Sequence, residues 1–251
     1  MPSNTPAIKI VSDVNELNRA AAEEFVNCAN SAIHTRGKFS VALSGGSTPR
    51  SIYELLANDQ KTPEKRLPWE RIFVFFGDER HVPPTDPESN YRMAYESLLS
   101  KVPIPEQNIF RVATELDANT AALQYEQQLL RFFGLDPSQS EAWPRFDLIM
   151  LGMGPDGHTA SLFPGSPALQ ETQRKVVANW VEKFKSFRIT FTFPVLNHAA
   201  EVMFTVSGEG KAEILNDVLK NPDKTLYPSQ RVQPENGRLL WIIDKAAAKL
   251  L

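Results

Sequence analysis

The residues best suited to chemistry lie in one stretch, residues 146–164. An apolar run at 148–151 is followed by a glycine-rich turn that holds a carboxylate, Asp156, and an imidazole, His158. Histidine has an ordinary pKa of about 6.5, so it can take up and release protons near neutral pH. A neighbouring carboxylate can position such a ring, or it can simply form the turn. The stretch therefore predicts a general base, with Asp156 either as its helper or as a turn residue.

Three glycines, Gly152, Gly154 and Gly157, let the backbone turn sharply here and let a ligand approach the main chain. Their spacing also matches the dinucleotide-binding pattern, which by itself is weak evidence. That pattern needs a long helix after the glycines, but Pro164 and Pro167 interrupt the chain too early. We therefore expect no cofactor at this turn.

A second turn follows the apolar run 39–43 and leads into a helical pattern at 50–57. It consists of Ser44, Gly45, Gly46, Ser47 and Thr48. Free N–H groups at a helix start, with hydroxyls beside them, suit a phosphate group. A plain glycine turn with a helix-capping hydroxyl is an equally good interpretation of this motif alone. Ser44 lacks the flanking glycines of a nucleophile elbow and is not predicted to be a nucleophile.

Charged residues follow a third apolar run, 72–76. In an extended backbone Asp78 and Arg80 point to one side and Glu79 to the other. Asp78 and Arg80 could then act on one ligand, although this motif alone favours a structural ion pair. His81 is expected to be a packing or surface residue.

Two further cations are candidates for binding an anion. In the alternating pattern 187–193, Arg188 falls on the polar face, which could be solvent or a pocket. Lys211 lies where a helix begins after the strand pattern 202–206. The glycines before it do not form a P-loop, because the spacer is too short and no Ser or Thr follows the lysine.

Strand and helix patterns alternate along the chain, which predicts an α/β fold with a mainly parallel, doubly wound sheet in a single domain, 1–251. Strands are expected at 8–11, 39–43, 72–76, 148–151, 176–181, 187–193, 202–206 and 239–243. Helices are expected from Asp13 to Gly37, at 50–57, at 90–100 and from Asp117 to Gly134. Two more are expected, one that follows the segment 207–212 and runs through Leu219, and a short one after Asp244. Leu123, Leu130 and Phe133 should face the core. In open α/β sheets ligands bind beyond the carboxyl ends of the strands, where the turns described above should meet.

Composition narrows the function classes. The chain has 251 residues and a formal net charge of −3, without a long basic run, which disfavours nucleic acid and anionic membranes as partners. One cysteine, Cys28, and four histidines exclude an internal disulfide and disfavour structural zinc, and Cys28 is expected in the core. Residues 1–6 lack the blocks of a signal peptide, so we expect a soluble cytoplasmic protein, either monomer or homodimer.

Five motifs occur in one order over essentially the whole chain, at 44–49, 76–80, 89–91, 152–164 and 207–212. With them the chain resembles the 6-phosphogluconolactonase family. The resemblance implies the sheet-and-helix fold shared with glucosamine-6-phosphate deaminases, and hydrolysis of 6-phosphoglucono-1,5-lactone in the oxidative pentose phosphate pathway. A lactone is an activated ester, so a base and oxyanion donors suffice, without a metal or a covalent nucleophile.

The resemblance implies that His158 is the general base. Asp78 would orient or assist it, and Arg80 would stabilise negative charge or hold the substrate. The phosphate cradle would comprise Ser44, Gly45, Gly46, Ser47, Thr48, Arg188 and Lys211. Supporting residues would be Asn90, Gly152, Gly154, Asp156 and Gly157. His81 departs from the family, which often has a larger aromatic residue there.

Two alternatives remain. Glucosamine-6-phosphate deaminases resemble this chain, but their motif carries a glutamate before the proline, where this chain has Phe163, which cannot transfer a proton. Non-catalytic sugar-phosphate sensors of this fold usually carry an N-terminal helix-turn-helix. The first strand pattern begins near Ile8, which leaves no room for one, and the histidine and the Asp-Glu-Arg group are intact.

Overall fold

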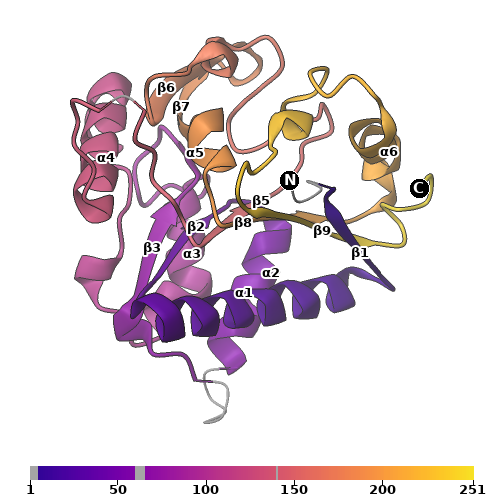
Figure 1. The fold of residues 1–251 in the computed structure, drawn as a ribbon, viewed down its shortest axis with the longest axis horizontal. Helices are drawn as coiled ribbons and strands as arrows, with labels where there is room; N and C mark the ends of the chain where they lie inside the picture. The colour runs from indigo at the N-terminus through magenta and orange to yellow at the C-terminus, as the bar shows by residue number, and fades with distance from the viewer. Residues whose placement is uncertain (1–4, 60–65, 140) are drawn as a thin grey trace.

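The structure is a computed structural model that describes residues 5–59, 66–139 and 141–251. Residues 1–4 of the N-terminal segment considered above therefore lie outside the described residues. A six-stranded sheet runs through the molecule in the order β1-β9-β8-β5-β2-β3, and every neighbouring pair is parallel (Figure 1). Its strands are β1 (Ala7–Val11), β2 (Phe39–Leu43), β3 (Ile72–Phe76), β5 (Leu148–Leu151), β8 (Glu201–Val206) and β9 (Arg238–Asp244). The apolar runs predicted all six to within one residue at each end.

Helices cover both faces of this sheet. They are α1 (Val14–Arg36), α2 (Ser47–Asp59), α3 (Asn90–Ser97), α4 (Ala118–Phe133), α5 (Phe193–Asn197) and α6 (Ala212–Lys220). Side chains alternate along each strand, so Val41 belongs to the hydrophobic core that includes residues of α1, α2 and α3, while Ala42 belongs to the core that includes residues of α4, α5 and α6. Figure 1 shows α1 and α2 on one side of the sheet and α4, α5 and α6 on the other. The predicted doubly wound architecture is confirmed.

Local signals set the ends of the long helices. The Asp13 carboxylate accepts from the N–H groups of Asn15 and Glu16 at the start of α1. Gly37 ends that helix with φ +75°, a conformation that glycine adopts without steric cost. Asp117 and Gly134 delimit α4 in the same way, as predicted.

A second, antiparallel sheet corrects the expectation of one continuing sheet. It has the order β4-β7-β6, with β4 (Asp78–Arg80), β6 (Val176–Val181) and β7 (Ser186–Phe191). Only a short 3-10 turn, Glu182–Phe184, joins β6 to β7, and a parallel crossover needs a dozen or more residues. β7 also ends before the predicted residue 193, because Phe193 and Pro194 begin α5.

Three further expectations need correction. Leu123 is 47% exposed, because the face of α4 that packs on the core carries Ala121, Ala122, Tyr125 and Leu129 instead. Helix α3 ends at residue 97, and a 3-10 turn, Leu99–Lys101, follows it. The segment after Asp244 forms turns and not a helix, with the Ala247 N–H bonded to the Asp244 carboxylate at 2.8 Å.

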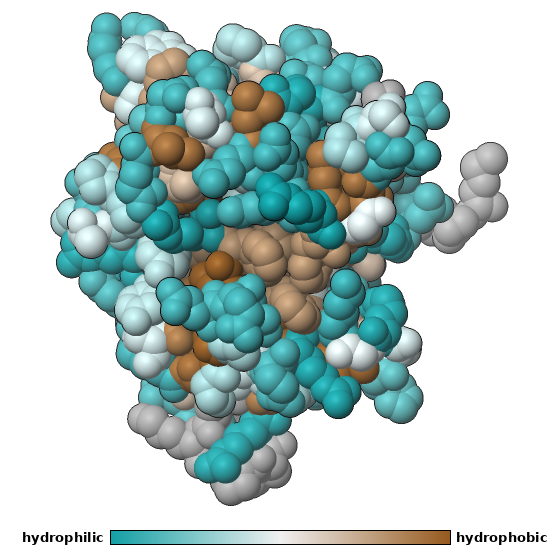
Figure 2. Space-filling model, turned by 90° about the vertical axis from the view of Figure 1, so that its left-hand side faces the viewer, coloured by the Kyte–Doolittle hydropathy of each residue, from teal (hydrophilic) through white to brown (hydrophobic). Residues whose placement is uncertain are grey.

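Aromatic packing joins α4 to the sheet edge. Phe75 of β3 stacks on Phe110 with centroids 4.4 Å apart, and Phe132 and Phe146 meet its ring edge to face. Figure 2 shows the side of the molecule that carries α4, where apolar residues lie in a hollow near the middle of a mostly hydrophilic surface. No helix among the described residues is long and apolar enough to cross a membrane.

Candidate active site

The predicted turns meet in a cavity of about 290 Å³ beyond the carboxyl ends of β2, β3, β5 and β8. Its lining residues are Ser44, Gly45, Asp78, Arg80, Asn90, Gly152, Met153, Gly154, Pro155, His158, Ala160 and Lys211. The crevice lies at the sheet edge where open α/β folds bind ligands. Among the predicted site residues, Gly46, Ser47, Thr48, Asp156, Gly157 and Arg188 lie outside this lining set.

His158 is held by a carboxylate on one side and a ring on the other. Its Nδ1 is hydrogen-bonded to Asp156 Oδ1, and its ring stacks on Phe163 with centroids 4.1 Å apart. With a proton on Nδ1 donated to the carboxylate, Nε2 carries the free lone pair that a base needs. The bond holds Asp156 ionised: burial opposes the charge, but hydrogen bonding and charge attraction from His158 lower the pKa of Asp156.

Gly154 makes this arrangement possible. A Cβ at Gly154 would lie 2.0 Å from Nδ1 and Cε1 of His158, so only glycine fits beneath the ring. The Gly154 N–H also donates to the His158 carbonyl at 2.8 Å, which closes the turn. At Gly157 the φ of +73° and the ring of Tyr227, 2.7 Å from a Cβ there, impose the same restriction.

Asp78 reaches the same cavity but has a different partner. Its Oδ2 accepts from Ser161 Oγ at 2.6 Å, and the Ser161 carbonyl accepts from Asn179 Nδ2 at 2.8 Å. Within the described residues, the carboxylate in contact with His158 is therefore Asp156. A direct orienting contact from Asp78, one of the roles expected from the sequence, is replaced by the contact from Asp156.

Glu79 points away from Asp78, as strand alternation predicted, and is 2% exposed. Its carboxylate accepts from the N–H groups of Arg80, Asn90 and Tyr91 at 2.7, 2.7 and 2.8 Å. Burial raises the pKa of Glu79, while these hydrogen bonds oppose the shift. The residue thus ties the first turn of α3 to β4 and fixes the backbone from which Arg80 projects.

Three cations, two that line the cavity and one beside them, have no carboxylate partner among the described residues. Arg188 lies directly across from Arg80 in the antiparallel pair β4–β7, and burial together with the Arg80 charge lowers the pKa of Arg188. Lys211 Nζ donates to the Met153 carbonyl at 2.8 Å, and burial lowers the pKa of Lys211. None of the three forms a salt bridge within the described residues. Such a concentration of unpaired positive charge suits an anion.

The serine-glycine turn closes the remaining wall. Tyr53 Oη accepts from the Ser44 N–H at 3.0 Å and donates to the Ser44 carbonyl at 2.9 Å, so one side chain holds both main-chain polar groups of Ser44. Gly46 has φ +111°, and α2 begins at Ser47. Gly46 and Ser47 are exposed and Thr48 is half-buried at this helix start, where free N–H groups favour an anion.

Sequence reasoning missed Lys183. Its Nζ lies 3.7 Å from Asp156 Oδ2, on the opposite carboxylate oxygen from His158. It comes from the turn between β6 and β7, and Phe184 beside it meets Phe163 edge to face. Because the turn is distant in sequence and has no motif of its own, no local signal pointed to it.

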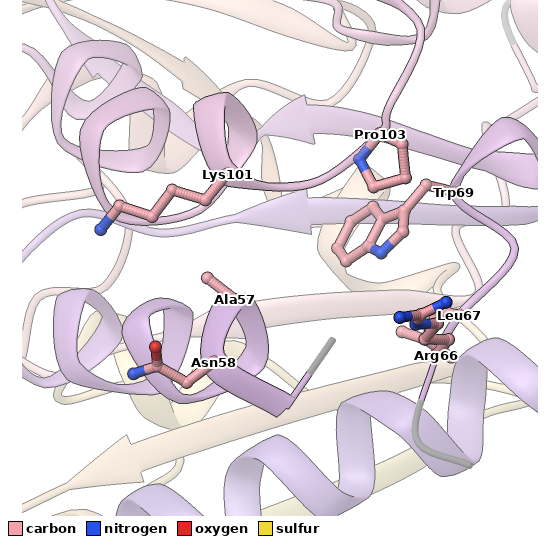
Figure 3. Close-up of a pocket in the computed structure, with 7 residues that line it drawn as sticks. All are labelled: Ala57, Asn58, Arg66, Leu67, Trp69, Lys101 and Pro103. Carbon is pink, nitrogen blue, oxygen red and sulfur yellow. The ribbon is translucent and has the colours of Figure 1, made fainter. Parts of the chain in front are cut away.

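Two other cavities formed by the described residues carry different groups. One of about 420 Å³ lies between the end of α2 and the 3-10 turns at Trp69 and Lys101 (Figure 3). Another, of about 400 Å³, lies at the amino-terminal edge of the sheet, where the carboxylate and thiol atoms of Glu24, Cys28 and Glu201 lie within 4.8 Å of one another. Arg238 already forms ion pairs with both carboxylates there, and burial raises the pKa of the half-buried Cys28 thiol.

Comparison with known proteins places this geometry in context. The family model described as glucosamine-6-phosphate isomerases/6-phosphogluconolactonase matches residues 12–241. The chain is 42% identical to a 6-phosphogluconolactonase from Nostoc sp., covering 96% of both chains, and 40% identical to one from Rattus norvegicus, covering 97% and 93%. A solved 6-phosphogluconolactonase from Trypanosoma cruzi superposes with a TM-score of 0.87 at 32% identity, covering 99% and 98%. A monomeric glucosamine-6-phosphate deaminase shares the fold, with a TM-score of 0.81 at 18% identity over 98% of this chain and 100% of that one.

Proposed function

The chain belongs to the glucosamine-6-phosphate isomerase/6-phosphogluconolactonase family, and from this premise we propose that it is a 6-phosphogluconolactonase. It hydrolyses 6-phospho-D-glucono-1,5-lactone to 6-phospho-D-gluconate, the lactone-opening step of the oxidative pentose phosphate pathway. The observation that carries the proposal is the Asp156–His158 pair, whose imidazole lines a cavity with Arg80 and Lys211, two cations that form no salt bridge within the described residues.

His158 acts as the general base. Its Nε2 takes a proton from a water molecule, and the resulting hydroxide attacks the lactone carbonyl carbon. The tetrahedral intermediate collapses by breaking the bond between that carbon and the ring oxygen, which receives the proton from the imidazolium. Asp156 holds the ring in the tautomer that exposes Nε2 and stabilises the imidazolium while it exists.

Cations supply the remaining stabilisation. Arg80 and Lys211 line the cavity, where they can hold the substrate phosphate or the oxyanion that develops at the carbonyl. Arg188 adds positive charge from the cross-strand position beside Arg80. Gly46, Ser47 and Thr48 contribute N–H and hydroxyl donors at the start of α2, whereas the Ser44 N–H is already bonded to Tyr53. Several donors suit a phosphate dianion better than one.

The deaminase alternative is disfavoured by the group beside the base. Phe163 stacks on His158 at the position where the deaminase motif carries a glutamate. A phenyl ring holds the imidazole in place but transfers no proton, so ring opening of an amino sugar would lack its acid.

We extend the proposal to the setting of the enzyme. The chain acts as a single domain, 1–251, without a cofactor, as a monomer or homodimer. We place it in the cytoplasm, because a chain with one cysteine holds no internal disulfide and so fits a reducing compartment.

Proton release from freshly generated 6-phosphogluconolactone, corrected for spontaneous hydrolysis, tests the proposal. Wild type should accelerate the reaction, and His158→Ala should lose on the order of a hundredfold or more of kcat. His34→Ala, in the last turn of α1, is the matched control and should retain wild-type activity. Equal rates for wild type and His158→Ala would reject His158 as the base, and no acceleration by wild type would reject the lactonase assignment.

A further inference from the structure

Asn90 occupies the junction between two walls of the cavity. It is the first residue of α3, it is 1% exposed, and it lines the cavity. Its backbone N–H donates to Glu79 Oε1 at 2.7 Å, and its Nδ2 donates to the Asp78 carbonyl at 2.9 Å. These two bonds fix the residue against β4 from both the main chain and the side chain, and the second one settles which way the amide points.

The other end of the amide points at the serine-glycine turn. A Cβ built on Gly45 would lie 1.9 Å from Asn90 Oδ1 and 2.5 Å from its Cγ. The Asn90 side chain therefore fills the space that a side chain at residue 45 would need. Gly45 has no positive φ, so the requirement for glycine there comes from Asn90 and not from backbone conformation.

Two buried polar atoms, one on Asn90 and one on the residue before Gly45, lack hydrogen-bond partners among the described residues. Asn90 Oδ1 and Ser44 Oγ are both inaccessible to solvent and unpaired. A buried polar atom without a partner costs free energy. An apolar side chain of the same shape at residue 90 would avoid that cost. An apolar residue, however, could not donate to the Asp78 carbonyl. Filling the space next to Gly45 would not by itself require an amide, but bonding to β4 does.

We propose that Asn90 is a positioning residue that couples the serine-glycine turn to the Asp78–Arg80 strand. Its amide is a spacer of set length between the two walls: one end is bonded to β4, and the other is in contact with Gly45. The spacer sets the separation between the anion donors of the turn and the Arg80 guanidinium. This inference rests on the proposed function only in taking the phosphate of the substrate as the ligand of those donors.

A double-variant cycle tests the coupling. Gly45→Ala should push the turn away from β4 and weaken phosphate binding by about tenfold or more, with a larger change in KM than in kcat. Asn90→Ala should weaken it by severalfold, because the turn loses its spacer. The double variant Gly45→Ala/Asn90→Ala should recover most of the loss caused by Gly45→Ala alone, since the new methyl group then has room.

The readouts separate this inference from the lactonase assignment. KM and kcat are measured with the lactone, and binding of inorganic phosphate is measured by calorimetry, which needs no turnover. Gly37→Ala, at the end of α1, is the control and should leave phosphate binding unchanged. Losses in the double variant that equal the product of the two single losses would overturn the coupling, as would unchanged binding in Asn90→Ala. If Gly45→Ala alone does not fold, a folded double variant that binds phosphate supports the proposal.

Discussion

Charged residues are arranged differently at the two ends of the central strands. We call the side of the sheet where the parallel strands begin its amino-terminal edge and the side where they end its carboxyl-terminal edge. At the amino-terminal edge the charged residues that line the cavity beside Cys28 are paired with one another. Arg36 pairs with Asp147, which also accepts from Ser40, and Arg238 bridges Glu24 and Glu201. At the carboxyl-terminal edge Arg80, Arg188 and Lys211 have no carboxylate partner among the described residues, and Asp156 is paired with an imidazole.

This difference separates structural charges from functional ones. Ion pairs at the amino-terminal edge join α1 to the starts of β5, β8 and β9 and leave little net charge for a ligand. The carboxyl-terminal edge also receives the start of α2, whose dipole adds to the unpaired cations. Parallel strands with right-handed crossovers place helix starts at that edge, which explains why the anion site forms there. Variants at the two edges should accordingly change different properties.

Gly154→Ala should have the largest effect. The methyl group would collide with the His158 ring, so kcat should fall on the order of a hundredfold, as for loss of the base itself. Gly37→Ala, at the amino-terminal edge, places a Cβ at φ +75° and should cost about 1 kcal/mol of stability without loss of activity. Steady-state kinetics and urea unfolding of both variants provide the test. An active Gly154→Ala enzyme would contradict the assigned position of the ring.

Asp156→Asn should have the next largest effect on activity, a loss of roughly tenfold to a hundredfold in kcat. The amide keeps the shape of the side chain but removes the charge that favours the Nδ1–H tautomer and stabilises the imidazolium. Asp147→Asn is the corresponding change at the other edge, where it should weaken the pair with Arg36 and leave kcat unaltered. Equal effects of the two substitutions on kcat would remove the distinction between the edges.

Glu201→Gln should change stability and not activity. Burial raises the pKa of Glu201 to about 7, so its stabilising contribution is present at low pH and is lost as the pH rises through that value. Between about pH 5 and about pH 8 the wild type should therefore lose on the order of 1 kcal/mol of unfolding free energy that the variant retains. Denaturant unfolding at the two pH values measures this difference. A wild type and a variant with the same pH dependence would show that Glu201 does not titrate in this range.

Lys183→Met should have the smallest effect, because the side chain is 58% exposed and its pair with Asp156 is screened by solvent. Without this cation Asp156 holds the imidazolium more strongly, so the pH of half-maximal kcat/KM should rise by a few tenths of a unit at low salt. Lys211 also interacts electrostatically with Asp156 and remains in the variant, so most of the positive charge near Asp156 should be preserved.

Lys185→Met is the control for that change, since Lys185 lies on the same turn but pairs with Glu182. Its pH profile should match that of wild type. Identical shifts in the two variants would assign the effect to the turn as a whole and contradict a specific role for Lys183.

Local sequence determined the parts of this protein. Mostly apolar runs of four or five residues set the strands of the central sheet, and Asp13, Gly37, Asp117 and Gly134 set the ends of two long helices, because these signals act between neighbours in the chain. Glycine turns at the carboxyl ends of the strands identified the site in the same way. Most of the residues that line the cavity could thus be selected before their contacts were known, but Met153, Pro155 and Ala160 were not among them.

Only the tertiary structure decided which of those residues touch. It placed β6 and β7 in a separate sheet, gave His158 the carboxylate of Asp156, and set Lys183 beside that carboxylate. It also brought Asn90 against Gly45, although the two residues are far apart in the sequence. Such contacts depend on how the turns of separate strands pack around one point. A periodic or local pattern in the sequence carries no information about the distance between two residues on different turns.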